Sequence, residues 1–252
     1  MAAGGPHAFV DNVDAPELSE GDRHHLANVL RLRPGDALTV SDGSGAWRPC
    51  VFAGRIEPCG DPIHVPEAAR EVAVGFALIK GGRPEVVVQK LTELGVDRIV
   101  LLNAERSIVR WDPDKEQRQM ERLDRVAREA SMQSRRVRLP MLEGVEPVES
   151  VVSLPGVAMT EPGGAPLDEA CSMLLVGPEG GWTPHELGAR QGVGLGPTIL
   201  RAETAAIAAG VLLTALREKM ARYPHHAMYC DHSASSQAFG PVPANSLTPL
   251  RI

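Results

Sequence analysis

The feature that most constrains the fold is an alternation of short apolar runs with helical patterns, which begins at Val72. Residues 72–78 and 98–102 have the length and apolar content of buried strands. Between them, residues 85–94 carry apolar side chains at helical spacing, and Gly95 follows as a stop signal. Strands and helices that alternate in this way form a parallel sheet covered by helices, so the chain predicts an α/β fold.

The same alternation continues toward the C-terminus. We expect a charged helix, two strands, one weak strand candidate and a long apolar helix, in that order, at residues 114–131, 157–159, 173–176, 193–195 and 205–220. Beyond residue 223 the chain is rich in His, Ser, Pro and Asn and has no periodicity. Residues 224–252 are therefore expected to be a disordered tail.

The N-terminal part has a different pattern. Residues 38–40 and 47–52 predict two short strands, and the Asp42-Gly43-Ser44-Gly45 run between them favours a hairpin turn. Residues 22–32 predict a helix that Pro34 and Gly35 bring to an end. We expect three regions: a small β-rich domain over residues 1–68, an α/β domain over residues 69–223, and the tail.

Composition limits the classes of function. A net charge of -6 excludes a uniformly basic surface, and only 4% aromatic residues argues against a broad stacking platform for nucleic acid. None of the four cysteines forms a CxxC pair or has zinc-finger spacing, so no metal site is expected. The chain has neither a run of about 18 apolar residues nor a signal-peptide pattern. We therefore expect a cytoplasmic protein without a membrane span.

Two segments carry the chemistry. In the first, residues 174–183, a strand runs into a turn with three glycines, which allow backbone amides to approach a ligand closely. Thr183, Pro184 and Glu186 then form a capping box at a helix start. In the second, residues 195–205, Arg201 and Glu203 precede an apolar helix. Taken singly, each segment has a purely structural alternative to ligand binding: the first is also typical of an ordinary turn, and the second of an ordinary helix cap.

Together and in this order, the two segments resemble the RsmE family of SPOUT-class RNA methyltransferases. Their sequences are GPEGG and LGPTILRAETA, and three further stretches also match that family, at residues 80–95, 129–136 and 24–36. The resemblance extends from about residue 9 to residue 222. It implies a SPOUT domain with a C-terminal trefoil knot after a PUA-like RNA-binding domain, that is, residues 69–223 after residues 1–68.

The resemblance also implies a function. Such enzymes use S-adenosylmethionine to methylate N3 of a specific uridine in 16S ribosomal RNA of the small subunit, and they act as homodimers. Three knot loops would hold the cofactor, through Met159, Thr160, Glu161, Gly177, Pro178, Glu179, Gly180, Gly181, Leu195, Gly196, Ile199, Leu200 and Thr204. Arg201 would stabilise negative charge on the uracil, and Glu203 is a candidate proton acceptor. For Glu203, helix capping or an interface salt bridge is an equal alternative.

Local positive charge must supply the contacts to RNA in a chain that is acidic overall. The candidate residues are His25, Arg31, Arg33, Lys80, Arg83, Arg106, Arg110, Gln133, Arg135 and Arg136. Three positions depart from the family pattern: the start reads His7-Ala8-Phe9 without a preceding arginine, and Thr198 and Ala202 stand where Arg and Thr are usual. Two other functions stay open, a noncatalytic RNA-binding or ribosome-assembly protein and a SPOUT enzyme for another RNA. A Rossmann loop at residues 192–196 is rejected, because the glycine spacing is wrong and Pro197 follows.

Overall fold

The computed structural model describes residues 5–81 and 83–219, and the expected tail at residues 224–252 lies outside them. Within the described part, the strands form two five-stranded sheets, one from residues 7–64 and the other from residues 73–165 and 173–176. Among the described helices, none combines the length and apolar content that crossing a membrane requires.

The N-terminal sheet is mixed. Its strands are β1 (His7–Phe9), β2 (Ala37–Ser41), β3 (Ala46–Phe52), β4 (Ile56–Pro58) and β5 (Ile63–His64). They pair in the order β1-β2-β3-β4, with β5 also on β3, and only β1 and β2 run parallel. Alternate residues such as Leu38, Val40 and Cys50 face a buried core that Leu26 completes.

The hairpin predicted around residues 42–45 is confirmed, because β2 and β3 pair across it. Asp42 Oδ1 accepts hydrogen bonds from the amides of Ser44 (2.7 Å) and Ala46 (3.1 Å), which fixes the turn. The helix expected at residues 22–32 is instead α1 (Glu20–His24) followed by the π-helical turn η1 (His25–Val29). It ends early because Arg31 has a φ of 55°, a left-handed conformation that no α-helix continues.

The second sheet is parallel throughout, as the alternation predicts. Its strands are β6 (Ala73–Ala77), β7 (Arg98–Asn103), β8 (Met141–Pro147), β9 (Val157–Ala165) and β10 (Met173–Val176). They lie in the order β8-β7-β6-β10-β9. The strand order is not the chain order, so the connections cross over the sheet.

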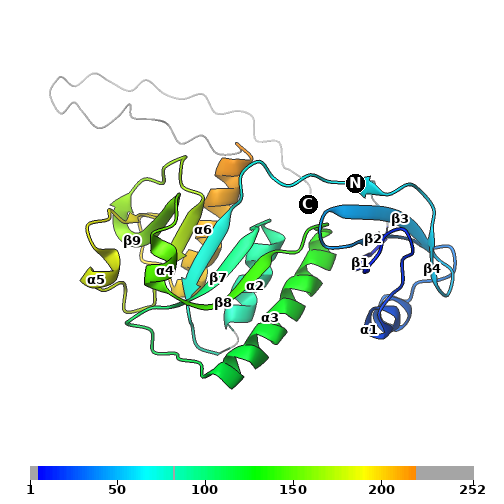
Figure 1. Cartoon of the computed structure of the whole chain (residues 1–252), viewed down its shortest axis with the longest axis horizontal. Coiled ribbons are helices and arrows are strands. Elements are labelled where there is room, and N and C mark those ends of the chain that lie inside the picture. Colours follow the sequence, from blue (N-terminus) through cyan, green and yellow to red (C-terminus); the bar gives the residue numbers. More distant parts are fainter. Residues whose placement is uncertain (1–4, 82, 220–252) are drawn as a thin grey trace, which may run out of the picture. The chain divides into compact units, whose positions relative to one another are not determined.

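Helices cover both faces of this sheet, as Figure 1 shows. They are α2 (Arg83–Glu93), α3 (Pro113–Ser134), α4 (Val148–Val152), α5 (Pro184–Leu187) and α6 (Ala202–Arg217). Val74 and Phe76 of β6 pack into the core shared with α2, α3 and α6, whereas Ala73 and Ala77 pack into the opposite core with α4. Because both faces of the strand are buried, its residues are apolar without alternation.

Besides the helix at residues 22–32, the sequence pattern was wrong or incomplete at three further places. The pattern did not predict β8 or α4, and it gave β9 as residues 157–159 only. The weak strand at residues 193–195 is not a strand, since only Val193 forms isolated bridges, to Thr160 and Ala165. The backbone of residues 192–194 passes very close to that of β9, and only glycine allows this approach. A Cβ on Gly164 of β9 would lie 2.5 Å from the carbonyl oxygen of Gly192. This contact places the second chemical segment beside β9.

Candidate active site

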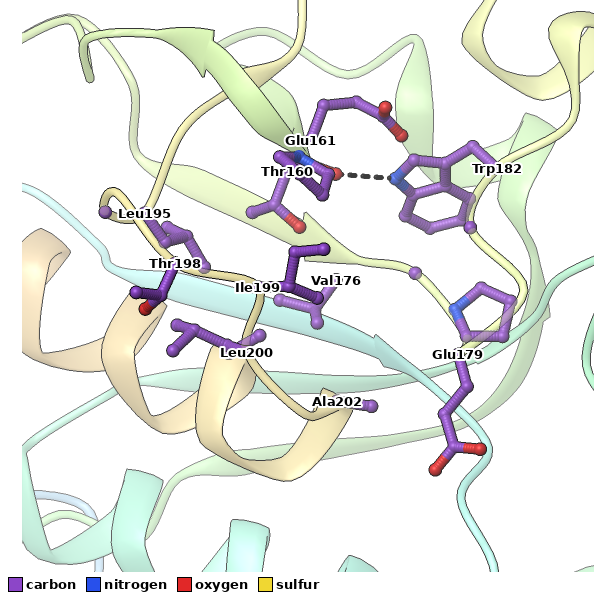
Figure 2. Close-up of a pocket in the computed structure, with 16 residues that line it drawn as sticks. Thr160, Glu161, Val176, Glu179, Trp182, Leu195, Thr198, Ile199, Leu200 and Ala202 are labelled. Atoms are coloured by element: carbon purple, nitrogen blue, oxygen red, sulfur yellow. Dashed lines mark hydrogen bonds between the residues drawn. The ribbon is translucent and has the colours of Figure 1, made fainter.

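A pocket with a volume of about 140 Å³ opens where three segments meet, and we call it the loop pocket (Figure 2). The segments are residues 160–162 of β9, residues 176–182 after β10, and residues 195–205, which lead into α6. The last two segments are the ones that the sequence singled out. In parallel sheets, ligands commonly bind at the carboxyl ends of the strands, and residues 176–182 leave the sheet at such an end.

The first two segments are joined by Trp182. Its indole Nε1 donates a hydrogen bond to the carbonyl oxygen of Thr160 at 3.0 Å, and its side chain is buried (Figure 2). A Cβ on Gly177 would lie 3.0–3.2 Å from three atoms of the same indole, so the ring packs against a glycine backbone. This explains why the turn after β10 begins with glycine, and it makes Trp182 part of the pocket's frame.

The third segment supplies an apolar wall. Leu195, Ile199 and Leu200 line the pocket, with Val176 on the strand behind them (Figure 2). Ile199 is 86% exposed, which is unusual for a side chain of this size and polarity. A large apolar side chain that stays in water at a pocket wall is suited to cover the flat face of a ligand.

Beside the pocket lies an ion-pair network of one arginine and two glutamates. Arg83 Nη1 is 3.6 Å from Glu179 Oε1 and 3.6 Å from Glu203 Oε1. The second carboxylate oxygen of Glu203 is buried and has no hydrogen-bond partner among the described residues. Arg201 is exposed and occupies the N-cap position of α6 without capping it through its side chain. One oxygen of Glu203 thus lacks a hydrogen bond inside the described part of the protein, and Arg201 is free to meet an anionic group.

Most residues expected to bind a cofactor line the loop pocket. Those that do are Thr160, Glu161, Gly177, Pro178, Glu179, Gly181, Leu195, Gly196, Ile199 and Leu200. Met159, Gly180 and Thr204 do not line it, and Met159 is a buried core residue instead. The lining also includes Trp182, Thr198 and Ala202, which lie inside the expected loops but outside the set of expected contacts, and Pro162, Val176 and Ala205, which sequence reasoning missed. These last three directly follow or precede the expected loops, so extending each loop by one residue would have found them.

Arg106, which was expected to bind RNA, has partners within the site. Its Nη1 donates to the carbonyl oxygens of Gly180 (3.1 Å) and Trp182 (3.0 Å). The buried carboxylate of Glu186 accepts hydrogen bonds from the amides of Glu105 and Thr183, both at 2.8 Å. Together these bonds fasten the loop after β7 to the glycine-rich turn, so Arg106 supports the pocket wall.

Three other arginines of the RNA set also donate to backbone carbonyls. Arg110 donates to Ala104 (2.9 Å) and to Glu105 (3.1 Å), and Arg135 donates to Gly5. Arg136 is the most enclosed: it donates to Thr92, Val96 and Arg138 at 3.0, 2.7 and 3.0 Å. Burial lowers the pKa of Arg136 to about 10. The structure thus gives Arg136 intramolecular partners in place of a free surface.

The remaining members of the RNA set are spread over the surface. Arg31, Arg33, Lys80 and Gln133 are exposed. His25 belongs to η1, and its side chain lies outside what the structure describes. The four exposed side chains are therefore the members of the set best placed for contact with phosphate or base, whereas Arg83 belongs to the ion-pair network.

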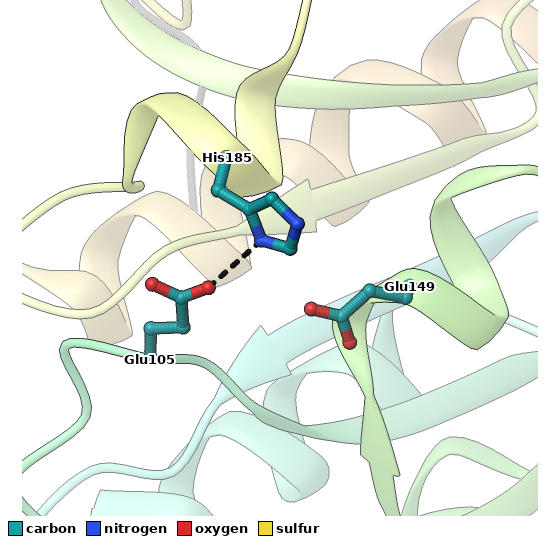
Figure 3. Close-up of side chains that lie close together, drawn as sticks. All are labelled: Glu105, Glu149 and His185. Atoms are coloured by element: carbon teal, nitrogen blue, oxygen red, sulfur yellow. Dashed lines mark hydrogen bonds and ion pairs between the residues drawn. The ribbon is translucent and has the colours of Figure 1, made fainter.

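Outside the loop pocket, three exposed side chains have the composition of a metal site: Glu105, Glu149 and His185 (Figure 3). Their candidate ligand atoms lie within 4.8 Å of one another. His185 Nδ1 lies 3.0 Å from Glu105 Oε1, a hydrogen bond that already accounts for two of the three side chains. Exposed acidic groups often gather without an ion, and we assign no metal to this cluster.

Comparisons with known proteins agree with this site. Residues 66–214 match the model of the RNA methyltransferase domain, and residues 18–56 match that of the RNA methyltransferase PUA domain. The chain belongs to the RNA methyltransferase family. The ribosomal RNA small subunit methyltransferase E of Mycobacterium bovis is 34% identical over 243 residues, which cover 86% of this chain and 93% of that protein. The Synechocystis enzyme of the same name is 32% identical and covers 80% of this chain and 73% of that protein.

Solved structures extend the match to the fold. A putative methyltransferase from Legionella pneumophila, in complex with the bound cofactor SAM, has a TM-score of 0.73 at 26% identity and covers 83% of this chain and 96% of that one. The Neisseria gonorrhoeae ribosomal RNA small subunit methyltransferase E bound to S-adenosyl methionine gives 0.71 at 26% identity, with 84% and 97% covered. This RNA methyltransferase therefore has the α/β parallel-sheet fold with a PUA domain that the sequence predicts.

Proposed function

We propose that this RNA methyltransferase transfers a methyl group from S-adenosylmethionine to N3 of a uridine in the 16S RNA of the small ribosomal subunit. The observation that carries the proposal is the loop pocket, which the two motif segments and β9 build together. The names of the relatives support the RNA class, and the two solved structures with bound S-adenosylmethionine support the methyl donor.

The residues present fit S-adenosylmethionine. Ile199 and Leu200 offer apolar surface for the adenine ring, and the backbone at Gly181 and Gly196 is open to close approach. The cofactor supplies an activated methyl group on a sulfonium. No further group is needed to make that methyl electrophilic, so the protein's task is to hold donor and acceptor in line.

Uracil N3 carries a proton at neutral pH, and the protein must help to remove it. As the N3–C bond forms, the carbon–sulfur bond breaks and its electron pair stays on sulfur, while the N3 proton leaves to a base. We assign the base role to Glu203, whose second carboxylate oxygen lacks a partner among the described residues. Arg201, exposed at the start of α6, would stabilise the negative charge that develops on the uracil oxygens.

The domain organisation belongs to the same proposal. We place a PUA-like RNA-binding domain at residues 1–68 and a SPOUT domain at residues 69–223, with the boundary between the two sheets. A trefoil knot near the C-terminal end is supported by the close passage of residues 192–194 along β9 before the chain enters α6. Since the proposed substrate is the ribosomal subunit, the enzyme would work in the cytoplasm.

A homodimer is the assembly that we propose. Its support is the apolar character of α6, on which Val211 is 43% exposed and Ile207 and Leu212 are half-buried. A helix with such a face commonly packs against another surface. Sedimentation velocity on the full chain tests this: a dimer that Val211→Glu converts to monomer is expected, and a wild-type monomer at micromolar concentration would refute it.

The function is tested with methyl-labelled S-adenosylmethionine and small-subunit RNA, offered both as naked 16S RNA and as 30S particles from a strain that lacks the modification. We expect label in the RNA of at least one of the two, and a large loss of turnover in Arg201→Ala. Cofactor binding without transfer to either substrate would point to another RNA target. The absence of cofactor binding as well would favour a noncatalytic RNA-binding or ribosome-assembly protein.

A further inference from the structure

A second pocket lies against the glycine-rich turn, and we call it the side pocket. It has a volume of about 210 Å³. A cavity of roughly 10–15 Å³ is enough for one water molecule, so the side pocket has room for a much larger group. Pro178 and Glu179 line both the side pocket and the loop pocket, so the two cavities share a wall. A group bound in one would be next to a group bound in the other.

Two segments give the side pocket apolar lining. Leu78 and Ile79 follow β6 and are buried, and Ile108, in the loop after β7, is 74% exposed. A flat aromatic group in the pocket that covers Ile108 would remove this side chain from water, which is favourable by the hydrophobic effect. The pocket thus offers apolar surface to a planar ligand.

The polar groups around the side pocket are mostly cationic. Arg106 is committed to the carbonyls of Gly180 and Trp182, and Arg83 is shared by Glu179 and Glu203. Lys80 is exposed, and within residues 5–81 and 83–219 the structure gives it no ion pair. Its ammonium is therefore available to a carbonyl oxygen of a base or to a phosphate.

We propose that the side pocket receives the target uracil after it has left the RNA stack. This inference rests on the function proposed above. The ring would lie between Ile108 and the Leu78–Ile79 segment, with a carbonyl oxygen toward Lys80 and the N3 edge at the shared wall. A base whose N3 is to react must be extruded, because that atom is on the Watson–Crick edge. Through Arg83, the same wall is connected to Glu203, the proposed base.

The test uses Ile108→Glu in the full-length enzyme, with Met141→Glu as the matched control. Both side chains are exposed (74% and 61%), so neither change needs to disturb the core. Met141 is at the amino end of β8, whereas the side pocket adjoins the carboxyl ends of the strands. We expect Ile108→Glu to lower kcat/KM for RNA by at least about tenfold, the scale for losing a buried isoleucine contact. The Kd for S-adenosylmethionine should stay within about twofold of wild type in both variants, since neither residue lines the loop pocket.

A photocrosslink provides a second readout that does not depend on turnover. The substrate is 16S RNA transcribed with 4-thiouridine in place of uridine, and the crosslinked peptides are mapped. A crosslink between residues 106–109 and the nucleotide that the wild-type enzyme methylates supports the assignment. Equal kcat/KM in the two variants, or no crosslink to this segment, overturns it. A wild-type enzyme that transfers no methyl refutes the proposed function, and a crosslink of residues 106–109 to any one uridine then decides whether the pocket takes a base.

Discussion

At the scale of single residues, His7 is a buried histidine held in its neutral form. Its ring nitrogens lie 2.8 Å from Thr39 Oγ1 and 2.9 Å from Ser41 Oγ, which are both on the neighbouring strand. Burial, with a smaller contribution from Arg135, lowers its pKa from 6.5 to about 4. In the unfolded chain the ring takes up a proton below pH 6.5, but in the folded chain only below about pH 4. The unfolded state therefore binds more protons in this window.

Stability is expected to fall as pH decreases from 6.5 to 4, by an amount on the order of 3 kcal/mol from this residue. Urea unfolding at several pH values measures it. His7→Asn should be less stable at pH 7 and should lose less stability on acidification. The control is His64→Asn, an exposed position in the same sheet, which should follow the wild-type profile. Parallel profiles for wild type and His7→Asn would contradict the assignment.

The residue scale also shows where sequence reasoning stopped. Arginine at positions 106, 110 and 136 indicates positive charge but not its partner, and all three donate to backbone carbonyls of this chain. Those carbonyls come from segments up to 76 residues away in the sequence, as for Arg106 and Trp182. For Arg106 and Arg136 only the fold brings these carbonyls within reach, so no local pattern could separate such a structural arginine from one that contacts RNA.

At the scale of elements, the loop pocket depends on how its loops are fastened. The single hydrogen bond from Trp182 to Thr160 links the turn after β10 to β9. Trp182→Phe keeps an aromatic ring over Gly177 but removes the donor. A hydrogen bond contributes about 0.5–1.5 kcal/mol, so we expect the affinity for S-adenosylmethionine to drop about 2- to 10-fold.

Isothermal titration calorimetry on the two proteins provides the measurement. Trp47→Phe is the matched control, since Trp47 belongs to β3 of the N-terminal sheet and does not line the loop pocket. It should bind the cofactor as wild type does. Wild-type affinity in Trp182→Phe would show that the two loops hold their positions without this bond.

The elements that the sequence predicted are the ones with strong local signals. Strands β6, β7 and β10 are continuous apolar runs, and α5 begins with the expected capping box at Thr183 and Glu186. By contrast, β8 is an edge strand with Glu143, Gly144 and Glu146, and its pairing with β7 has an irregularity between Val100 and Leu101. The residues of an edge strand such as β8 are only partly buried, so their composition resembles that of a loop and gives no strand signal.

At the scale of the whole molecule, the N-terminal sheet and the α/β domain are connected through Arg128 of α3. Its Nη2 donates to the carbonyl oxygen of Phe9 (3.1 Å) and to Asp22 Oδ2 (3.2 Å), and its guanidinium carbon lies 5.0 Å from the centre of the Phe9 ring. Arg128→Ala removes all three contacts. We expect it to reduce the stability of the N-terminal sheet by about 1–2 kcal/mol.

Hydrogen exchange of the β1–β3 amides measures this effect, since it reports local opening of that sheet. Arg118→Ala provides the control, because this exposed arginine is on the same helix. Faster exchange in β1–β3 only for Arg128→Ala is the expected result. Equal exchange in both variants would mean that Arg128 does not stabilise the sheet.

The arrangement of the whole chain was predicted better from the family motifs than from local patterns. Periodicity indicated a parallel sheet but not the strand order β8-β7-β6-β10-β9, because strand order depends on contacts between distant segments. The same holds for the pocket: residues 160–162 and 195–205 meet only in the fold. The resemblance to the RsmE family predicted these loops from the sequence, and in the structure most of their residues line one pocket.

The identity of the product nucleoside shows whether the proposed methylation of uridine N3 takes place. RNA methylated with labelled S-adenosylmethionine is digested to nucleosides and separated by chromatography against N3-, C5- and 2′-O-methyluridine standards. We expect the label to elute as N3-methyluridine and to map to one position of the 16S RNA. Label in either of the other isomers, or in a nucleoside other than uridine, would contradict this expectation.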